Sequence, residues 1–315
     1  MNLDLRSTLR GNPQAPARHD TPPDLLSTER TGIRCREIRD SDIEGVVNLL
    51  TKGFGVRPRL FWAQAFQRLS QHQTPPTFPK YGYLLEDGER PVGVLILVFS
   101  SIMHEDGTPI IRCSVSSWYT DPAYRIHAAM LASRALRLKA VTYFNITPHP
   151  NTVPALVAQG YSKYCDGAFI CFPALRYGPP GTRVRLIRTG MKPDTSLPSW
   201  ESDLLFRHSD LGCVCMICSF QGHSYPFIFL RHRGFGMVPC AYLTYCRKID
   251  DFSRFAGPLG RFLLRYGISV VELDANGALK GLVGKYLNNV PKYFKGPAKP
   301  RLGDICYSER VMFGF

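Results

Sequence analysis

The chain has 315 residues, of which 44% are apolar and 20% charged, and its formal net charge is +14. This balance is typical of a globular protein with one large or two ordinary domains. No apolar run reaches the roughly 18 to 20 residues that cross a bilayer, and the N-terminal residues lack the apolar core of a signal peptide. We therefore expect a cytoplasmic protein that is not transmembrane. The positive charge favours an anionic partner: nucleic acid, an anionic membrane surface, a phosphate-bearing cofactor or an acidic carrier protein.

The first half of the chain alternates between strand and helix patterns. Residues 1–32 are polar and rich in Pro, and they predict a disordered tail. The apolar spacing and turn residues that follow predict these elements in chain order: a strand over 33–39, helices over 41–50 and 59–69, a hairpin over 81–100, a strand over 110–120, a helix over 131–138, a strand over 140–147, a short helix over 151–160 and one or two strands over 161–172.

A Pro- and Gly-rich stretch over 179–200 separates the two halves and predicts a linker that contains one short strand over 182–187. Beyond it the pattern predicts strands over 212–220, 224–232 and 238–246, a helix over 252–267, a strand over 268–275, a helix over 277–287 and a closing strand over 304–315. This order partly repeats that of the first half. We therefore expect an internal structural duplication.

Of the ten cysteines, three are close together in the sequence: Cys213, Cys215 and Cys218. A zinc site would need a second pair of cysteines, or histidines at ligand spacing, and no convincing set follows. We therefore expect these residues to be small, buried and reduced, and we predict no metal site.

The stretch from Lys280 to Arg301 has six basic and no acidic residues, with Tyr286, Tyr293 and Phe294 among them. Aromatic residues between lysines suit stacking on bases with phosphate contacts. They also suit an acidic carrier protein or a lipid headgroup layer. The remaining alternative is a solvated loop before the closing strand.

The order of elements over 33–175 resembles the GNAT superfamily of acyl-CoA N-acyltransferases. Pro-Ala-Tyr-Arg at 122–125 follows the fourth strand, where that superfamily has a Pro-x-Tyr-Arg-Gly-x-Gly-x-Gly type of motif. The segment NTVPALVAQGY at 151–161 resembles the superfamily's Asn-led helix, which ends in Gly-Phe or Gly-Tyr. The resemblance implies an α/β (α+β) fold of two GNAT-like units, each with a mixed, mostly antiparallel sheet flanked by helices. The first unit, over 33–178, would bind the donor, and the second would span 201–315.

The resemblance also implies a site for an acyl-CoA donor. Its pyrophosphate would lie at the start of the helix after the fourth strand, near Arg125, Ile126, His127, Ala128, Ala129 and Met130. The pantetheine arm would pair with the fourth strand near Trp118 and Thr120 and contact Asn151. The second half has charged residues, Arg247 to Asp251, in place of such a turn, so we expect no second cofactor site there.

Three positions depart from the superfamily's pattern. Ala128 and Met130 stand where the motif has glycines, so we expect a looser or differently shaped cradle. Leu156 stands where many members have a Tyr that protonates the leaving thiolate, and residues 111–120 contain no carboxylate. The remaining candidates for catalysis are Tyr119, Tyr143 and His149.

The leading hypothesis is an acyltransferase. It would move an acyl group from acyl-CoA, or from an acyl-carrier-protein thioester, to an amine or hydroxyl of a small molecule or saccharide. An alternative resembles the Fem-type transferases, which take the acyl group from aminoacyl-tRNA, and the basic stretch favours it. A third alternative is a non-catalytic GNAT-like binding protein, which the missing Tyr and carboxylates favour.

Overall fold

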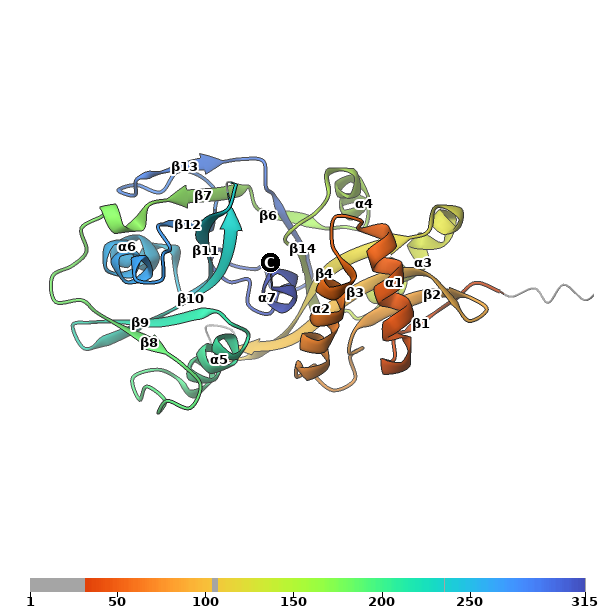
Figure 1. Cartoon of the computed structure of the whole chain (residues 1–315), viewed down its shortest axis with the longest axis horizontal. Helices are drawn as coiled ribbons and strands as arrows, with labels where there is room; N and C mark the ends of the chain where they lie inside the picture. Colours follow the sequence, from red (N-terminus) through yellow and green to blue (C-terminus); the bar gives the residue numbers. More distant parts are fainter. Residues whose placement is uncertain (1–31, 104–106, 235, 315) are drawn as a thin grey trace, which may run out of the picture. The chain divides into compact units, whose positions relative to one another are not determined.

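Two mixed sheets of seven strands each form the framework of the computed structural model (Figure 1). The structure describes residues 32–103, 107–234 and 236–314, so the predicted tail lies outside the described residues except for Gly32. The chain from Ile33 onward forms one compact unit. No helix in the described ranges is both long and apolar enough to cross a membrane.

The first sheet has the strand order β1-β2-β3-β4-β5-β14-β6. Among the described strands, β4 and β5 pair in parallel and all the other pairs of this sheet are antiparallel. The bounds of its strands are β1 Arg34–Glu37, β2 Gly82–Asp87, β3 Arg90–Met103, β4 Pro109–Thr120, β5 Val141–Asn145, β6 Ser162–Cys165 and β14 Lys292–Lys295.

The second sheet has the order β13-β7-β12-β11-β10-β9-β8, and of the strand pairs that the structure describes here, β11 with β12 is the parallel one. Read from β8, it repeats the arrangement of the first sheet, which confirms two GNAT-like units. The bounds are β7 Gly167–Cys171, β8 Arg183–Ile187, β9 Val214–Phe220, β10 His223–Gly234, β11 Val238–Cys246, β12 Val270–Ala275 and β13 Gly284–Leu287.

The two sheets exchange strands, so their membership does not follow the order of the halves. β6 and β7 are separated only by Asp166, yet β6 belongs to the first sheet and β7 to the second. The chain crosses back between β13 and β14, and β14 fills the position between β5 and β6. The division at 178 and 201 stays a prediction, but each sheet needs a strand from the other side of it.

Helices cover both faces of the first sheet. The bounds are α1 Ile43–Gly53, α2 Arg59–Gln71, α3 Ala128–Ala135, α4 Val153–Ala158, α5 Ser199–Asp210, α6 Ile249–Leu264 and α7 Glu309–Phe313. One core contains Leu50 of α1 and Phe66 of α2, together with residues of α5 and α7. Another core contains Leu131 of α3 against β2 and β3. α1 and α2 therefore lie on one face of this sheet and α3 on the other (Figure 1).

Helix α6 packs on the second sheet through apolar residues at helical spacing, among them Phe252, Phe255 and Leu259. Gly260 lowers helix propensity, but a Cβ there would lie 2.3 Å from the backbone nitrogen of Ala174. The short 3₁₀ helix η4 (Pro173–Leu175) can approach α6 closely because this residue has no side chain.

The elements of the first half agree with the predicted ones, and four differences lie in the second half. One is β14, a strand in a stretch for which the sequence predicts no element. The predicted helix over 277–287 is wrong: the segment ends in β13, where a Cβ on Gly284 would lie 2.2 Å from the carbonyl oxygen of Ile170. The predicted closing strand is wrong too, because residues 309–313 form α7. Helix α5 had not been predicted; it begins inside the expected linker, which also contains β8.

The clustered cysteines are buried, as the sequence predicts. Cys213 and Cys215 belong to one core, whereas Cys218 points into another, across the second sheet. Burial raises the pKa of the Cys213 and Cys218 thiols to about 12. These thiols face opposite sides of the sheet and cannot converge on one ligand.

Candidate functional site

The strands β4 and β5 form a fork in the first sheet. They pair from Ile111 to Ser114, and beyond Ser114 the described pairing of β4 is with β3 alone. The register between β3 and β4 shifts at Ser117, which has a φ of 42° and is therefore the extra residue of a bulge. The fork leaves one edge of β4 available to an extended ligand.

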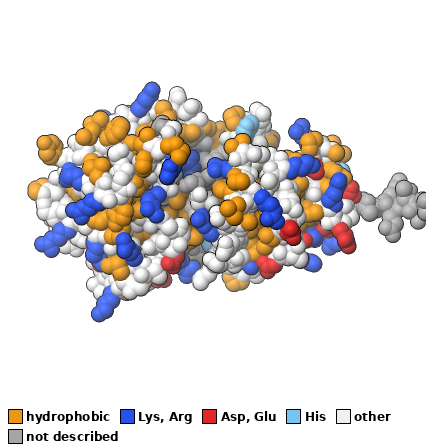
Figure 2. Space-filling view, viewed as in Figure 1, with side chains coloured by type: hydrophobic (Ala, Val, Ile, Leu, Met, Phe, Trp, Pro, Cys, Tyr) orange, Lys and Arg blue, Asp and Glu red, His pale blue; other side chains and the backbone are white. Residues whose placement is uncertain are grey.

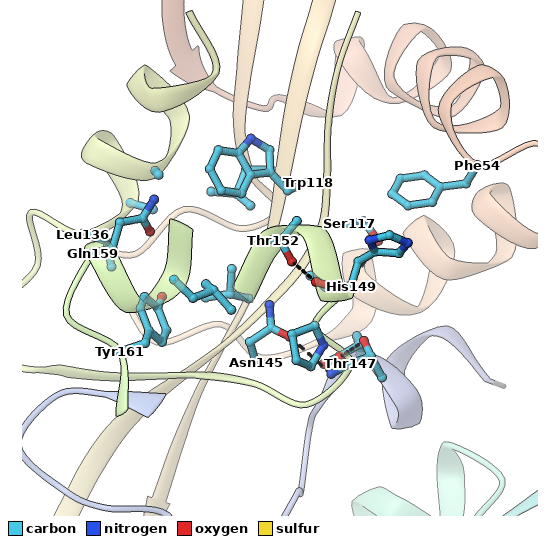
Figure 3. Close-up of a pocket in the computed structure, with 18 of the residues that line it drawn as sticks. Phe54, Ser117, Trp118, Leu136, Asn145, Thr147, His149, Thr152, Gln159 and Tyr161 are labelled. Carbon is cyan, nitrogen blue, oxygen red and sulfur yellow. Dashed lines mark hydrogen bonds between the residues drawn. The ribbon is translucent and has the colours of Figure 1, made fainter. Parts of the chain in front are cut away.

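A cavity of about 220 Å³ lies at this fork. In Figure 3, Leu136, Gln159 and Tyr161 lie toward one end of it and Phe54 and His149 toward the other. Its walls come from the α1–α2 region, β3, β4, α3, the end of β5 and the segment after it, the α4 region and α7: Phe54, Arg57, Phe61, Trp62, Leu95, Val115, Ser116, Ser117, Trp118, Ala132, Ala135, Leu136, Asn145, Thr147, Pro148, His149, Thr152, Leu156, Gln159, Tyr161 and Glu309.

Glu309, the first residue of α7, is the carboxylate among the residues that line this cavity, and it is 1% exposed. It accepts hydrogen bonds from the hydroxyl of Ser114, the last residue of β4 that pairs with β5, and from Thr147 Oγ1 at 2.9 Å. Burial raises the pKa of Glu309 above its ordinary value, and these two hydrogen bonds oppose the rise. A buried carboxyl with a raised pKa at a fork is suited to proton transfer.

Sequence reasoning missed Glu309 because it searched for a carboxylate in β4 itself. The residue lies 195 positions from Ser114, and α7 brings it to the fork from the far end of the chain. The signal available was Ser308-Glu309, a helix-capping residue followed by an acidic one. The alternation of apolar residues over 304–315 hid this signal.

Of the predicted catalytic residues, His149 lines the cavity, and its Nδ1 accepts a hydrogen bond from the Asn151 N–H at 3.3 Å. Tyr119 and Tyr143 do not line it. The Tyr119 hydroxyl donates to Asp121 at 3.0 Å, and that of Tyr143 donates to the Ala135 carbonyl at 2.5 Å. Burial raises the pKa of Tyr143. The structure therefore brings His149, but neither Tyr, to Glu309's cavity.

The residues predicted to hold the pantetheine arm do not all line the cavity. Trp118 lines the cavity, whereas Asn151 is exposed outside it. The Thr120 hydroxyl is buried without a hydrogen-bond partner among the described residues. Leu156 lines the cavity where the superfamily has a Tyr, but Tyr161, two residues beyond α4's C-cap residue Gln159, supplies a hydroxyl-bearing side chain to the same wall.

The turn after β4 is the 3₁₀ helix η2 (Pro122–His127), which runs directly into α3. It uses N–H groups internally: Tyr124 donates to the Asp121 carbonyl at 2.8 Å and Ala128 to the Arg125 carbonyl. Arg125, Ala129 and Met130 are exposed, Ile126 is 85% exposed, and His127 and Ala128 are half-buried. A pyrophosphate site needs unpaired N–H groups, so binding by Arg125–Met130 stays a prediction that rests mainly on the Arg125 charge.

The second sheet has the corresponding fork, where β11 and β12 pair only from Cys240 to Tyr242. Here the chain's own backbone covers the free edge of β11. The Cys246 N–H donates to the Gly303 carbonyl at 2.8 Å, and the Ile305 N–H donates to the Thr244 carbonyl at 3.0 Å. Residues 303–305 thus occupy the edge of β11 that corresponds to the free edge of β4 in the first sheet.

No family model and no curated protein matches the sequence. Among solved structures, a GCN5-related N-acetyltransferase from Anabaena variabilis superposes with a TM-score of 0.56 at 9% identity, over 88% of this chain and 74% of that one. Another GCN5-related N-acetyltransferase, from Kribbella flavida, gives 0.51 at 11% identity, over 87% and 72%. The likeness spans both sheets and agrees with the predicted resemblance. The chain has the fold of the GCN5-related N-acetyltransferase (GNAT) superfamily, built as two units that exchange a strand.

Proposed function

We propose that the chain transfers an acyl group from a pantetheine thioester, that of acyl-CoA, to the amine of a small molecule at the β4–β5 fork. The observation that carries the proposal is Glu309, a buried carboxylate that lines the cavity of the open fork. The GNAT fold supports acyl transfer in general. The donor and the acceptor are part of the proposal.

The thioester arm fits the fork because one edge of β4 is free beyond Ser114 and because small residues, Ala132 and Ala135, form the α3 wall. The backbone of β4 would hold the arm's amides, and an N–H near the Ser117 bulge would stabilise negative charge on the thioester oxygen. The cavity is smaller than the roughly 300 to 1,000 Å³ of a drug-sized ligand, which favours a short acyl group.

In the proposed reaction the acceptor nitrogen attacks the thioester carbonyl carbon, the C–N bond forms and the C–S bond breaks. Glu309 accepts the proton that the amine loses, and the Tyr161 hydroxyl supplies a proton to the departing thiolate. Burial raises the pKa of Tyr161, so the hydroxyl is protonated at neutral pH before the reaction begins. His149, at the Phe54 end of the cavity (Figure 3), lies on the acceptor side in this proposal.

A second candidate is an acyl group carried by another macromolecule, an acyl carrier protein or a tRNA. The observation that favours it is the turn at η2, which lacks glycines and uses N–H groups internally. Both candidates place the reacting carbonyl at the same fork. They differ in what binds outside it.

The proposal predicts that Ala132→Phe weakens donor binding. A ring at this position would project into the cavity from α3, and overpacking costs of about 1 to 3 kcal/mol correspond to roughly 5- to 150-fold weaker binding. Isothermal titration with acetyl-CoA measures the effect.

The matched control is Ser133→Phe, which places the same ring on the exposed side of α3, outside both the cavity and the predicted pyrophosphate turn at Arg125–Met130. It should leave the affinity unchanged. Equal affinities for both variants would show that the thioester does not enter this cavity. Thermal melts of both variants separate a lost site from a lost fold.

A further inference from the structure

Three segments around the second sheet contain no acidic residue: 167–193, 253–271 and 275–303. They lie against one another. β7 pairs with β13, the Phe172 N–H donates to the Val283 carbonyl at 2.9 Å, and Arg176 Nη1 donates to the Lys280 carbonyl at 3.1 Å. From α6, Arg261 Nη1 donates to the Arg176 carbonyl at 3.3 Å. Segments distant in sequence thus lie together, and none of the three contains a carboxylate side chain.

Large apolar side chains protrude from this surface. Phe172 is 45% exposed, Leu175 64%, Tyr177 94% and Val283 54%. They come from the η4 region and the segment before β13, which the Phe172–Val283 hydrogen bond joins. A cluster of exposed apolar side chains marks an interaction site more often than scattered single ones do.

Basic side chains surround these apolar residues: Arg176, Arg261, Lys280 and Lys285. The described residues give none of the four an ion pair with a carboxylate. In Figure 2, Lys and Arg side chains lie among hydrophobic ones over the left part of the view, where Figure 1 places α6, β7 and β13, and acidic side chains are sparse there. We call these four basic and four apolar residues the acid-free face.

We propose that the acid-free face binds the surface of an anionic lipid bilayer, with Leu175, Tyr177, Phe172 and Val283 entering the headgroup boundary. Basic side chains attract anionic lipids, and aliphatic and aromatic ones gain by leaving water at the interface. Tyr is suited to that depth because its ring is apolar and its hydroxyl stays hydrated. Nucleic acid fits less well, because Leu175 and Val283 cannot stack on bases as aromatic rings do.

The test measures co-sedimentation of the full chain with vesicles of phosphatidylcholine, with and without phosphatidylserine. We expect binding only when phosphatidylserine is present. Each basic side chain near an anionic surface contributes about fivefold to partitioning, so Lys280→Glu with Lys285→Glu should weaken binding about 25-fold or more. Leu175→Ser with Tyr177→Ser should weaken it at unchanged net charge.

The control is Arg137→Glu with Lys139→Glu, the same change of charge at exposed positions after α3. It should keep most of the binding. An equal loss in the control would show that net charge alone is responsible and would overturn the proposal. Equal binding to neutral and anionic vesicles would also overturn the proposal. So would a result in which Lys280→Glu with Lys285→Glu abolishes binding of a short RNA but leaves vesicle binding unchanged. Melting temperatures show whether the two double variants fold. If one of them does not fold, the other still tests the proposal.

Discussion

Glu309→Gln is expected to lower kcat/KM for acyl transfer by about 10²- to 10⁴-fold, the range of a lost general base. The amide is nearly isosteric and can still accept a hydrogen bond from Ser114 or Thr147, so the fork should keep its shape. It cannot take a proton from the acceptor amine. An exposed carboxylate on α1, Glu44, which is 80% exposed at its side chain, gives the control variant Glu44→Gln. That variant should react at the wild-type rate.

The same substitution should change how stability depends on pH. Burial raises the pKa of Glu309 above its ordinary 4.5 in the folded chain. The unfolded chain therefore releases this proton first, and wild-type stability should fall as pH rises above about 4.5 through the folded pKa. Glu309→Gln should be more stable than wild type above this window and should lose that part of the pH dependence. Urea unfolding at several pH values measures it. A variant less stable at neutral pH would show that the carboxylate is mainly structural.

Lys292→Met is expected to lower the free energy of unfolding by about 3 to 5 kcal/mol, the cost of leaving a buried charge unpaired. Lys292 of β14 lies 2.5 Å from Asp274 of β12, and their side chains are 3% and 1% exposed. The Tyr242 hydroxyl donates to the same carboxylate. The pair thus joins the exchanged strand of the first sheet to the second sheet. Urea unfolding gives the change.

A matched control lies on the neighbouring strand. Lys163 of β6 pairs with Asp166 at 2.7 Å, with side chains 51% and 44% exposed. Because water screens exposed pairs, Lys163→Met should lower the free energy of unfolding far less than Lys292→Met does. The double variant Lys292→Met, Asp274→Leu should recover much of the single variant's loss. If Lys292→Met costs no more than Lys163→Met, the exchanged strand does not depend on this pair.

The helices and strands of the first half could be predicted because the pattern that indicates each one lies within a short stretch of sequence. The alternation in β3, the apolar spacing of α1 and the Gly88 turn between β2 and β3 each lie within a few residues. The order of these elements then sufficed for the resemblance to the GNAT superfamily. Strand exchange has no such signal, because β14 pairs with β5 across about 150 residues of sequence.

The basic stretch shows how composition alone can mislead. Lys292 counts as one of six basic residues in an acid-free run, yet it is buried against Asp274. Tyr293 and Phe294 belong to β14 and pair with β5 and β6 rather than forming a free aromatic surface. Lys280, which precedes β13, and Lys285, which lies within it, are exposed on the segment that joins the apolar residues of η4.

The sequence predicted a site between the fourth and fifth strands, and the structure has a cavity there; that this cavity is the functional site stays a prediction. Trp118 and His149 line the cavity as expected for a site between the fourth and fifth strands. The Tyr143 hydroxyl instead donates to a backbone carbonyl at the end of α3. The sequence could not predict this, because inward- and outward-facing residues of β5 cannot be told apart without knowing what covers each face of the sheet. Glu309 arrives through a tertiary contact that no local pattern records.

The release of free thiol from acetyl-CoA, measured with a panel of primary amines, tests the central claim most directly. The account predicts that wild type consumes the thioester only when an amine is present and that Glu309→Gln and Ala132→Phe lose this activity. Thiol release that is equal in wild type and Glu309→Gln would contradict the assigned chemistry. Wild type could consume no acyl-CoA but use an acyl carrier protein or an aminoacyl-tRNA as donor, in a reaction that Glu309→Gln abolishes. That result would support the fork as the active site and contradict CoA as the donor. No reaction with any of these donors would contradict the account as a whole.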